Sequence, residues 1–480
     1  MQQESSWATT EFENVDLGDT RLNERLAGLC SRFSDSPESP INQACEDWAE
    51  TKAAYRFFGN TNVSASAITN AHVHKTAERV AAHKTILAIQ DTSYFIYTSH
   101  LKTKGLGRLA SKKGKNVDDI PSTGLLMHAC LAVATDGTPL GLLDQQIYSR
   151  TYDVCRRTEP HVSIPIEDKE SYRWLSSLRQ VNLHAEGPRI VTVCDREADI
   201  YEFFEESAGL KAPVLVRARI DRTISKGDAS ITSGGTTLWR HMAEQPIAGS
   251  IAIKVPLRRK SKQHQERAPR TALISIRFGS FQLIPPRNLV YNRDKTPPPL
   301  PMFAVYAVET NPPEGVEPVE WMLLTNLAVT TFDQACEKIR WYSLRWRIEM
   351  YFKVLKSGFN VEMCRLEHAN RLIKYLAVMS VVAWRLFMIT LIARATPCTP
   401  CSELLADHEW KILFMKINKS HKLPEKVPTI GEVVIWIARL GGFLARKGDG
   451  MPGTITLWRG WKRLMDLAEG WSLASERICG

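Results

Sequence analysis

The interpretation of the whole chain depends on one stretch, Tyr342-Ser-Leu-Arg-Trp-Arg-Ile-Glu-Met-Tyr-Phe-Lys-Val-Leu-Lys356. It predicts a helix, and a helix with about 3.6 residues per turn presents positions i, i+3, i+7 and i+14 on one face. These positions hold a phenol, a guanidinium, a carboxylate and an ammonium, on Tyr342, Arg345, Glu349 and Lys356. A carboxylate among such groups is typical of a site that holds a metal ion and grips phosphates.

Two aspartates upstream each follow a strand-like apolar segment. Asp91 ends Thr85-Ile-Leu-Ala-Ile-Gln-Asp91, and Asp195 ends Arg189-Ile-Val-Thr-Val-Cys-Asp195. Two aspartates at strand ends and one glutamate on a late helix predict a site of three carboxylates. Because Mg²⁺ prefers hard oxygen ligands to thiols, such a site suits divalent metal ions that act on phosphodiesters.

The composition is that of a globular protein with an excess of positive charge. A chain of 480 residues predicts about two to four domains. Its 62 Lys and Arg exceed its 52 Asp and Glu, and the formal net charge of +10 favours a polyanionic partner. The first residues do not resemble a signal peptide and the 10 cysteines are scattered, so we expect a cytoplasmic protein with reduced thiols.

One apolar run, at residues 375–393, has the length of a membrane span. Arg385 lies at its middle, where a charge costs roughly 2.5–3.5 kcal/mol on insertion scales. We therefore expect a buried core or interface helix, and no membrane partner.

The remaining pattern predicts an α/β protein. The expected order is strand, strand, strand, helix, strand, helix, strand, at residues 86–89, 125–134, 140–148, 169–178, 190–194, 198–208 and 214–219. Asp136-Gly137 lies between the second and third strands and is a hairpin signal. This order, with acids after the first and fourth strands, is that of a ribonuclease-H-like mixed sheet.

Helical segments are expected on both sides of this sheet. Residues 1–75 predict a helical N-terminal domain, in which Leu17-Gly-Asp19 caps a helix and Arg21, Arg25 and Arg56 could contact DNA. Residues 76–370 predict the catalytic domain, with a β-rich insertion at 220–325, and residues 371–480 predict a helical C-terminal region. Two basic stretches, around Lys112 and at 258–262, are loops, and the second is either simply charged or a phosphate contact.

The pattern Tyr-x2-Arg-x3-Glu-x6-Lys resembles the signature of bacterial cut-and-paste DDE transposases of the insertion-sequence-four family. Val193-Cys-Asp-Arg-Glu-Ala-Asp199 and Tyr342-x-x-Arg-Trp-Arg-Ile-Glu349 are similar to the transposon-five type within that family. Less specific likenesses extend from Leu17-Gly-Asp19 to residues 437–443 and so cover nearly the whole chain.

The resemblance implies a ribonuclease-H-like core between a helical DNA-binding domain and a helical dimerisation region. It implies a homodimer on paired double-stranded DNA ends, which are cut by two-metal phosphodiester hydrolysis through a hairpin. The 3′-OH ends are then joined to target DNA. We expect the partner surface at residues 372–391 and 439–443, and nucleoid association during the reaction.

The resemblance also assigns roles by position. Asp91, Asp195 and Glu349 match metal ligands for two Mg²⁺ ions, for which Mn²⁺ would substitute. Phosphate-holding positions correspond to Tyr342, Arg345 and Lys356, other DNA-contacting positions to Arg217 and Lys353, and positions that manage a flipped base to Trp321 and Trp346. Two residues depart from the best-known member of the type: Leu22 replaces the second of two arginines, and Met350 replaces a second acid after Glu349.

Other interpretations remain open at this point. A ribonuclease-H-like nuclease that only hydrolyses DNA would share the acids but would not need the Tyr, Arg and Lys side chains. A domesticated DNA-binding protein would tolerate the loss of an acid. Some residues have ordinary explanations: Cys398 and Cys401 form one cysteine pair without a second, His128 is a core or DNA-proximal residue, and Glu197 and Asp199 are acids at a helix N-terminus.

Overall fold

The computed structural model describes residues 7–45, 47–109, 122–150, 164–184, 187–225, 236–255, 268–286, 297–446 and 449–478. Both basic stretches singled out above, with Lys112 and with residues 258–262, lie outside the described residues. The chain divides into two compact units. The first unit comprises Met1–His83, Thr92–Arg156 and Arg347–Gly480, and the second unit comprises Lys84–Asp91 and Arg157–Trp346.

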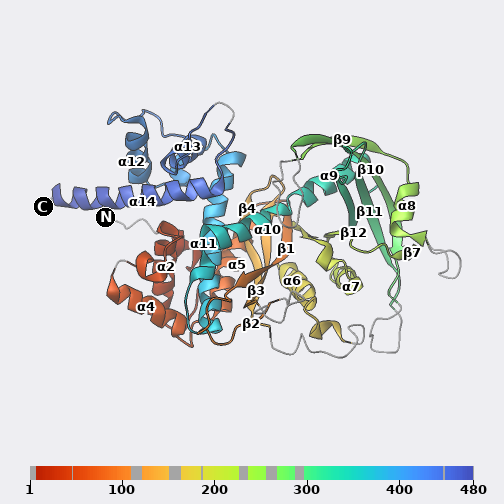
Figure 1. Cartoon of the computed structure of the whole chain (residues 1–480), viewed down its shortest axis with the longest axis horizontal. Coiled ribbons are helices and arrows are strands. Elements are labelled where there is room, and N and C mark those ends of the chain that lie inside the picture. Colours follow the sequence, from red (N-terminus) through yellow and green to blue (C-terminus); the bar gives the residue numbers. More distant parts are fainter. Residues whose placement is uncertain are drawn as a thin grey trace. The chain divides into compact units, whose positions relative to one another are not determined.

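The first unit begins with helices, as the sequence predicts (Figure 1). They are α1 (Trp7–Glu11), α2 (Thr20–Asp35), α3 (Ile41–Ala44), α4 (Trp48–Gly59) and α5 (Ala65–Ala81). The Asp19 side chain accepts a hydrogen bond from the backbone N–H of Arg21 at 2.9 Å, and Gly18 takes a φ of +75° that favours glycine. The predicted cap at Leu17-Gly-Asp19 is therefore confirmed.

A short antiparallel sheet follows in the first unit. β3 (Thr123–Ala134) and β4 (Pro139–Tyr148) form the predicted hairpin, and Gly137 in its turn has a φ of +96°. β2 (Gly107–Arg108) pairs with one side of β3, and β1 (Thr85–Ile96) lies on the other side. Helix α5 packs against β4.

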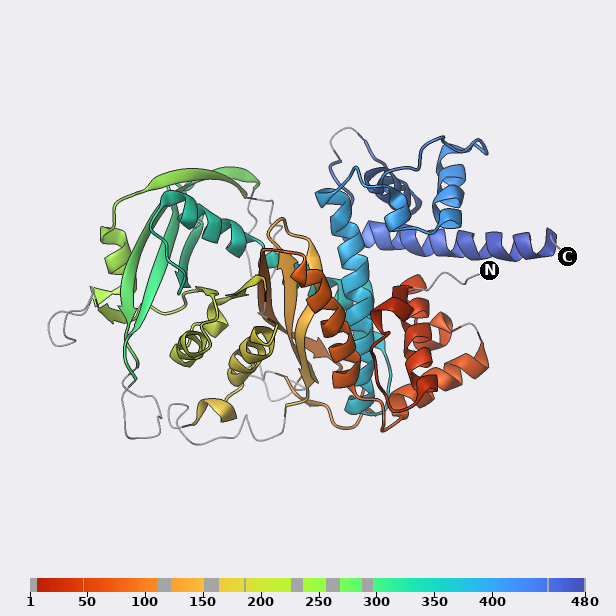
Figure 2. The same cartoon turned by 180° about the vertical axis from the view of Figure 1, so that it is seen from behind.

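Helix α11 (Ala369–Ala395) is the core helix of the first unit (Figures 1 and 2). It is long and apolar enough to cross a membrane, but 83% of its most apolar window is buried. It packs against α2, α4, α5 and β4. The expectation of a core helix is confirmed, and the chain itself covers most side chains of residues 372–391, so a partner surface there stays a prediction.

Arg385 of α11 shows how the core accommodates a charge. Its guanidinium carbon lies 4.7 Å from the centre of the Trp7 ring of α1. Burial lowers the pKa of Arg385 to about 10, with nearby carboxylates opposing the shift, so the side chain stays charged near neutral pH. A cation over an aromatic ring thus joins α1 to the core helix.

Helices also complete the C-terminal part of the first unit. α10 (Trp346–Lys353) runs into a π-helical turn (Val354–Gly358), and a 3₁₀ turn (Val361–Met363) precedes α11. After α11 come a 3₁₀ turn (Cys401–Glu403), α12 (Asp407–Asn418), α13 (Ile430–Leu440) and α14 (Thr454–Ile478). The predicted helical character from residue 370 onward is confirmed.

The second unit contains a mixed sheet with strand order β1-β5-β6-β12-β11-β10-β7-β8, and β9 pairs with β10. Its further strands are β5 (Arg189–Cys194), β6 (Val214–Arg217), β7 (Thr223–Ser225), β8 (Thr236–Thr237), β9 (Gly249–Val255), β10 (Arg270–Leu283), β11 (Leu300–Glu309) and β12 (Glu320–Thr325). β1, β5 and β6 are parallel, and the strands from β12 onward are antiparallel. The β-rich segment expected at 220–325 thus continues the sheet through β12.

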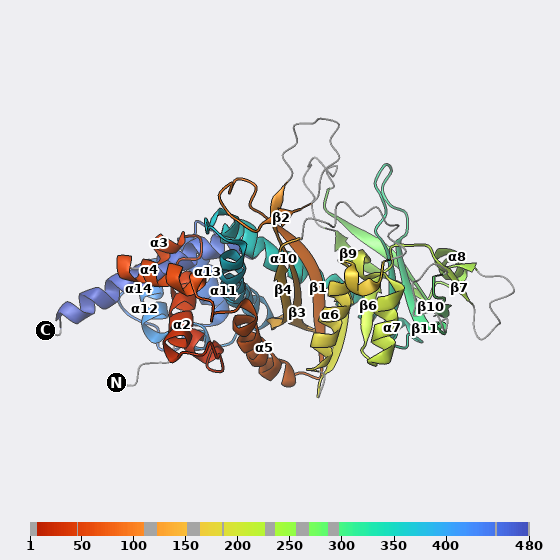
Figure 3. The same ribbon diagram turned by 90° about the horizontal axis from the view of Figure 1, so that it is seen from below.

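Helices cover both faces of this sheet. α6 (Tyr172–Asn182), α7 (Tyr201–Gly209) and α8 (Leu238–Glu244) share an apolar core with β6, β11 and β12, and Figure 3 shows α6 and α7 next to each other. Short 3₁₀ turns precede α6 (Ile166–Asp168) and α7 (Arg196–Ala198). α9 (Phe332–Ser343) packs against β10 and β11, with Trp321 and Tyr342 in contact on the face opposite the apolar core.

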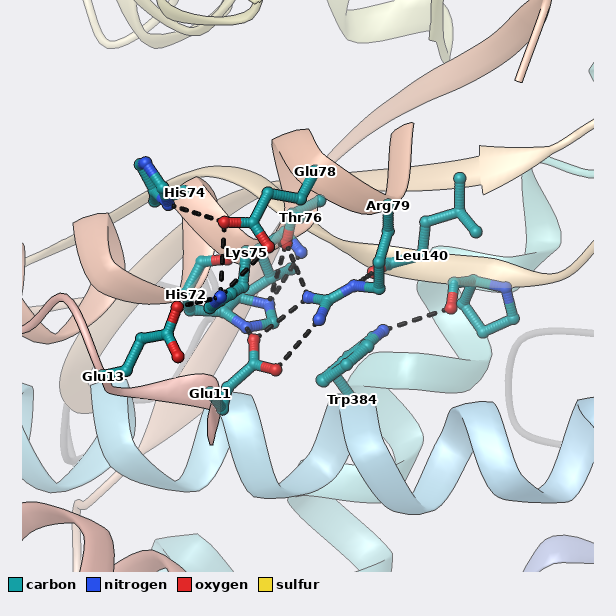
Figure 4. A network of polar contacts seen from close by, with 12 residues as sticks. Glu11, Glu13, His72, His74, Lys75, Thr76, Glu78, Arg79, Leu140 and Trp384 are labelled. Carbon is teal, nitrogen blue, oxygen red and sulfur yellow. Dashed lines mark hydrogen bonds and ion pairs between the residues drawn. The ribbon is translucent and has the colours of Figure 1, made fainter. Parts of the chain in front are cut away.

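A buried polar network ties α1 to α5 and β4 in the first unit (Figure 4). His72 Nδ1 lies 2.5 Å from Glu11 Oε1, and His72 Nε2 accepts the backbone N–H of Leu142 at 2.9 Å. Arg79 donates to both Glu11 oxygens, at 2.9 and 3.0 Å, and lies over the Trp384 ring. Because Nε2 is an acceptor here, His72 is neutral and carries its proton on Nδ1.

This network predicts a loss of stability in acid. Burial lowers the pKa of His72, so the unfolded chain takes up a proton below about pH 6.5 that the folded chain refuses. The unfolding free energy should then fall by about 1.4 kcal/mol per pH unit until the folded pKa is reached. Urea unfolding at pH 7.5 and 5.5 measures this slope, and His72→Gln should flatten it. Equal slopes in both proteins would exclude His72 as the source.

The same network contains a carboxyl group that acts at lower pH. Burial works against ionised Glu11, but His72 and Arg79 outweigh it and lower its pKa to about 2. The stability that ionised Glu11 gives to the folded state is therefore fully present above about pH 4.5 and is lost as the pH falls toward 2. Protonation of either group lowers the unfolding free energy as the pH falls. The two losses occur in different pH ranges, so unfolding measurements over pH can tell them apart.

Candidate active site

Asp91 and Asp195 each lie just past the paired segments of two neighbouring strands of the second unit. β1 and β5 run parallel, with Ile89 opposite Val193. Asp91 and Asp195 each lie two residues past this last pair, so continuing the register would set them opposite each other, on the side of Ile89 and Val193. Because neighbouring strands lie about 4.8 Å apart, we expect the two carboxylates to be neighbours.

The structure corrects the expected strand end at Asp91. β1 continues from Asp91 to Ile96, and the backbone N–H of Tyr97 donates to Thr123 O at 2.8 Å. The parallel pairing with β5 ends at Ile89, after which β1 continues beside its other neighbour, β3. The polar run Asp91-Thr-Ser93 ends the apolar pattern but not the strand.

Asp195, by contrast, directly follows β5, as predicted. Its side chain accepts the backbone N–H of Glu197 at 2.8 Å and so caps the short 3₁₀ turn that follows. The Glu197 side chain pairs with Arg173 of α6 at 2.7 Å. The turn after Asp195 is therefore fixed to a helix of the same unit.

Asp199 has a different role from the helix-terminal acid that we expected. It is 3% exposed, forms an ion pair with Arg222, and accepts the backbone N–H of Arg219 at 2.6 Å. Asp199 thus holds the segment after β6 against the turn after Asp195. The sequence gives no signal for this contact, because Asp199 and Arg222 lie on separate elements.

Arg345 faces Asp91 within the second unit. Its Nη1 lies 3.5 Å from Asp91 Oδ2, and the two side chains are 11% and 17% exposed. Arg345 also lies over the ring of Trp346, at 5.4 Å from the ring centre, and Trp346 is 58% exposed. A guanidinium therefore balances the charge of Asp91, beside an exposed tryptophan.

The single helix expected from Tyr342 to Lys356 is wrong in detail. α9 ends at Ser343, a tight turn carries Leu344 and Arg345, and α10 begins at Trp346. The N–H groups of Leu344 and Arg345 bond three residues back, to Trp341 O and Tyr342 O, which tightens the backbone as in a 3₁₀ helix. Lys356 lies in the π-helical turn that follows, so ideal α-helical spacing does not apply along this stretch.

Tyr342, Trp321 and Arg217 form a cluster in the second unit. The rings of Trp321 and Tyr342 meet edge to face, with centres 5.4 Å apart. Arg217 is hydrogen-bonded to Tyr342, and its Nη2 donates to Glu320 O at 2.9 Å. Arg217 Nε is buried without a partner among the described residues, and burial lowers the pKa of Arg217. This cluster thus holds a desolvated cation with a spare N–H donor.

Glu349, Lys353 and Lys356 belong to the first unit. Glu349 is half-buried in α10, Lys353 is exposed, and Lys356 Nζ lies 5.3 Å from the centre of the Phe95 ring of β1. Farther along, Glu362 accepts the backbone N–H of Ile96 at 2.7 Å. These contacts attach the segment that follows Glu349 to the part of β1 that follows Asp91.

The donor chemistry suits a divalent cation. Asp91 and Asp195 supply hard oxygen ligands from paired strands, which Mg²⁺ and Mn²⁺ prefer. Among the described residues, no three His, Cys, Asp or Glu side chains gather closely enough to hold an ion. Cys398 is exposed and Cys401 is buried, and both thiols are free. A complete metal centre therefore needs a third ligand in addition to the two aspartates.

The N-terminal helices present arginines on α2 and α4. Arg21 is 88% exposed beside Asp19, and Arg56 is exposed on α4. A cavity of about 340 Å³ is lined by Arg21, Glu24, Arg25, Gly28, Leu29, Arg32, Cys45 and Glu50. Arg32 is paired with Glu50, so Arg21 and Arg25 are the cations of this cavity that are oriented toward solvent.

His128 and the Asp136-Gly137 pair have structural roles. His128 is fully buried, and its Nδ1 lies 2.9 Å from Thr92 Oγ1, so it is a core residue of the first unit. Asp136-Gly137 forms the hairpin turn described above.

Family models match three successive parts of the chain. The transposase DNA-binding model matches residues 4–63, the transposase DDE domain model matches residues 172–384, and the transposase Tn5 dimerisation domain model matches residues 381–477. With the ribonuclease-H-like mixed sheet, they define a DNA transposase with a DDE catalytic domain. The chain belongs to the DDE transposases of the Tn5 type.

This membership confirms the main functional expectations. The protein is an enzyme that binds DNA, forms a homodimer and uses divalent metal ions. Asp195 and Glu349 lie within the matched DDE segment, whereas Asp91 precedes it. The assignment of Asp91 therefore depends on its register with Asp195.

Proposed function

We propose that Asp91, Asp195 and Glu349 together hold two Mg²⁺ ions, for which Mn²⁺ substitutes, and that the protein cuts its DNA ends by phosphodiester hydrolysis. The observation that carries this proposal is the parallel register of β1 and β5, since Asp91 and Asp195 each lie two residues past its last pair. When bound, two such ions stabilise the charge that develops on the attacking and leaving oxygens. The tie between β1 and the segment after Glu349 supports the choice of the third ligand.

The surrounding cations are proposed to hold the DNA backbone near the cut. Arg345 and Arg217 supply planar guanidinium groups, which suit the oxygens of a phosphate. The Tyr342 phenol, bonded to Arg217, stays neutral because burial raises its pKa, and it can donate its proton to a phosphate oxygen. Lys353 and Lys356 are proposed to contact phosphates farther along α10 and the turn after it.

Recognition of the ends is assigned to the N-terminal helices. We place Arg21 and Arg56 at the DNA, since both are exposed within the segment matched by the DNA-binding model. The proposed domains are residues 1–75 for DNA binding, 76–370 for catalysis with 220–325 as its β-rich part, and 371–480 for dimerisation. The reaction takes place in the cytoplasm, and we propose that the protein joins the nucleoid while it acts.

We further propose that cutting proceeds through a DNA hairpin and ends with the joining of 3′-OH ends to target DNA. A hairpin bends the end of the duplex sharply, so a base must leave the stack at a cost of a few kcal/mol. An aromatic surface that stacks this base recovers about 1–3 kcal/mol. Trp321, beside Tyr342, and the exposed Trp346 are the proposed surfaces.

Trp321→Ala should separate the two steps of cutting. The first nick needs no sharp bend and should be spared, whereas hairpin closure should slow by about one to two decades. Denaturing gels over time resolve nicked and hairpin DNA. An abasic nucleotide at the extruded position should partly rescue the variant, because it lowers the cost of unstacking. Equal loss of both steps, with a less stable protein, would mark Trp321 as a core residue.

A test of the whole proposal uses DNA that carries the inverted repeats flanking the gene. With Mg²⁺, the purified protein should produce hairpin-ended DNA and then joined products on a target plasmid. An enzyme that only hydrolyses DNA, the alternative considered above, would produce cut fragments and no joined product. A protein that binds these ends without cutting in Mg²⁺ or Mn²⁺ would be a DNA-binding protein instead.

A further inference from the structure

Glu320 is the first residue of β12, and its carboxylate accepts two hydrogen bonds from aromatic side chains. Trp239 Nε1 of α8 and Tyr306 OH of β11 each lie 3.0 Å from Glu320 Oε1. Trp239 is itself held, because its backbone N–H donates to Asp221 Oδ1 at 2.9 Å. We call Glu320, Trp239 and Tyr306 the Glu320 anchor. It fixes one end of β12 to a helix and to the neighbouring strand.

The next residue along β12 points to the opposite face of the sheet. Side chains alternate along a strand, so Glu320 shares a face with Met322 and Tyr306, while Trp321 shares a face with Leu323 and its partner Arg217. We call Trp321, Arg217 and Tyr342 the Trp321 group, which the edge-to-face contact and the Arg217–Tyr342 hydrogen bond hold together.

The two sets meet at Glu320. Its side chain belongs to the Glu320 anchor, and its backbone carbonyl accepts Arg217 Nη2 at 2.9 Å. A shift of the strand end would therefore move the Trp321 ring and the acceptor of Arg217 at once. Burial, with Glu320 as the second cause, raises the pKa of Tyr306 to about 12, so its phenol remains a donor near neutral pH.

We propose that Glu320 is a positioning residue, which acts through β12 to set the place of the Trp321 group during DNA cutting. The expected effect of Glu320 on the reaction rests on the proposed stacking of a base on Trp321. Its expected effect on the position of the Trp321 ring in the protein does not. Glu320 itself needs no contact with DNA. Its carboxylate is hydrogen-bonded on the core face of the sheet, and its loss should move the Trp321 group on the opposite face.

The first experiment observes the protein without DNA. The full chain is labelled with 5-fluorotryptophan, and Trp321→Phe identifies one fluorine resonance among 13 tryptophans. Glu320→Ala and Tyr306→Phe should each shift or broaden the Trp321 resonance, whereas Glu320→Gln, the matched control, should keep it because an acceptor oxygen remains. An unchanged Trp321 resonance in both Glu320→Ala and Tyr306→Phe overturns the proposal. Tyr306→Phe, which removes a single hydroxyl, keeps the test valid if Glu320→Ala does not fold.

The second experiment measures the reaction in a double-mutant cycle. Glu320→Ala should slow hairpin closure by roughly three- to tenfold and change nicking less than about twofold. In a Trp321→Ala background it should have almost no further effect, since the ring it positions is gone. The proposal is overturned if the losses in the rate of hairpin closure add up in the double variant while Glu320→Ala alone shows a normal fluorine spectrum. If Trp321→Ala leaves hairpin closure intact, the proposed base stacking fails, and the fluorine experiment alone then decides the role of Glu320.

Discussion

Asp195→Ala should abolish DNA cleavage while binding of the DNA ends survives. Asp195 is partly exposed just after β5, the parallel neighbour of β1, and we propose that it holds metal ions together with Asp91. Loss of a ligand from such a site removes charge stabilisation worth several kcal/mol, which corresponds to a loss on the order of 10³-fold or more in rate. End recognition is assigned to the N-terminal helices, so a gel shift should be unchanged. Cleavage assays in Mg²⁺ and Mn²⁺ measure the effect.

The same result is expected for Asp91→Ala and Glu349→Ala. Glu197→Ala is the matched control, since Glu197 lies two residues after Asp195 but pairs with Arg173 instead. Because this pair also fixes the turn after Asp195, Glu197→Ala should cut DNA somewhat more slowly than the normal protein, but far faster than the acid variants. Mg²⁺-dependent cleavage near the normal rate by any of the three acid variants would remove that residue from the proposed site.

Gly460→Ala should break the packing of the C-terminal helices. A Cβ at Gly460 of α14 would lie 1.7 Å from Ile437 O of α13, and one at Gly441 would lie 1.8 Å from Thr456 O. Backbone atoms cannot yield as a flexible side chain can, so the helices must separate, at a cost of about 3 kcal/mol or more. These helices lie within the segment matched by the dimerisation model. We expect single-end binding without dimerisation, and therefore no coupled cutting of two ends.

Gly470→Ala on the same helix is the control for that variant. Nothing lies within 4 Å of a Cβ at Gly470, so alanine there should be neutral or stabilise the helix by up to about 1 kcal/mol. Light scattering of the DNA complexes and hydrogen exchange of α14 compare the two proteins. A Gly460→Ala protein that dimerises and cuts as well as Gly470→Ala would show that the helices do not need this close contact.

Local chemistry explains which parts of the fold the sequence predicts. Asp136-Gly137 marks its hairpin because the turn needs a positive φ, and Asp19 marks a helix start because its side chain caps the first N–H groups. Asp195 follows an apolar run that is buried in a parallel sheet, and the run ends where the strand ends. These features depend on residues that are close in sequence.

Features that depend on distant partners were missed or mispredicted. β1 continues beyond Asp91 because β3 pairs with it, and no local pattern reports that pairing. The helix around Arg345 is interrupted although its residues favour helix, since the backbone bonds there shorten to three-residue steps. Asp199 and Glu320 likewise take their roles from partners on other elements. The sequence of helix α11 is apolar enough for a membrane span, a core helix or an interface helix. Its burial in the structure identifies it as a core helix.

The proposed metal ligands can be tested most directly by cleavage of the protein itself. Fe²⁺ substitutes for Mg²⁺, and with ascorbate and peroxide it generates radicals that cut the polypeptide close to the bound ion. With DNA ends present, we predict fragments that end near residues 91, 195 and 349, competed away by Mg²⁺ and absent in Asp195→Ala. Fragments at other positions, or the same fragments from Asp195→Ala, would contradict a metal centre built from these three carboxylates.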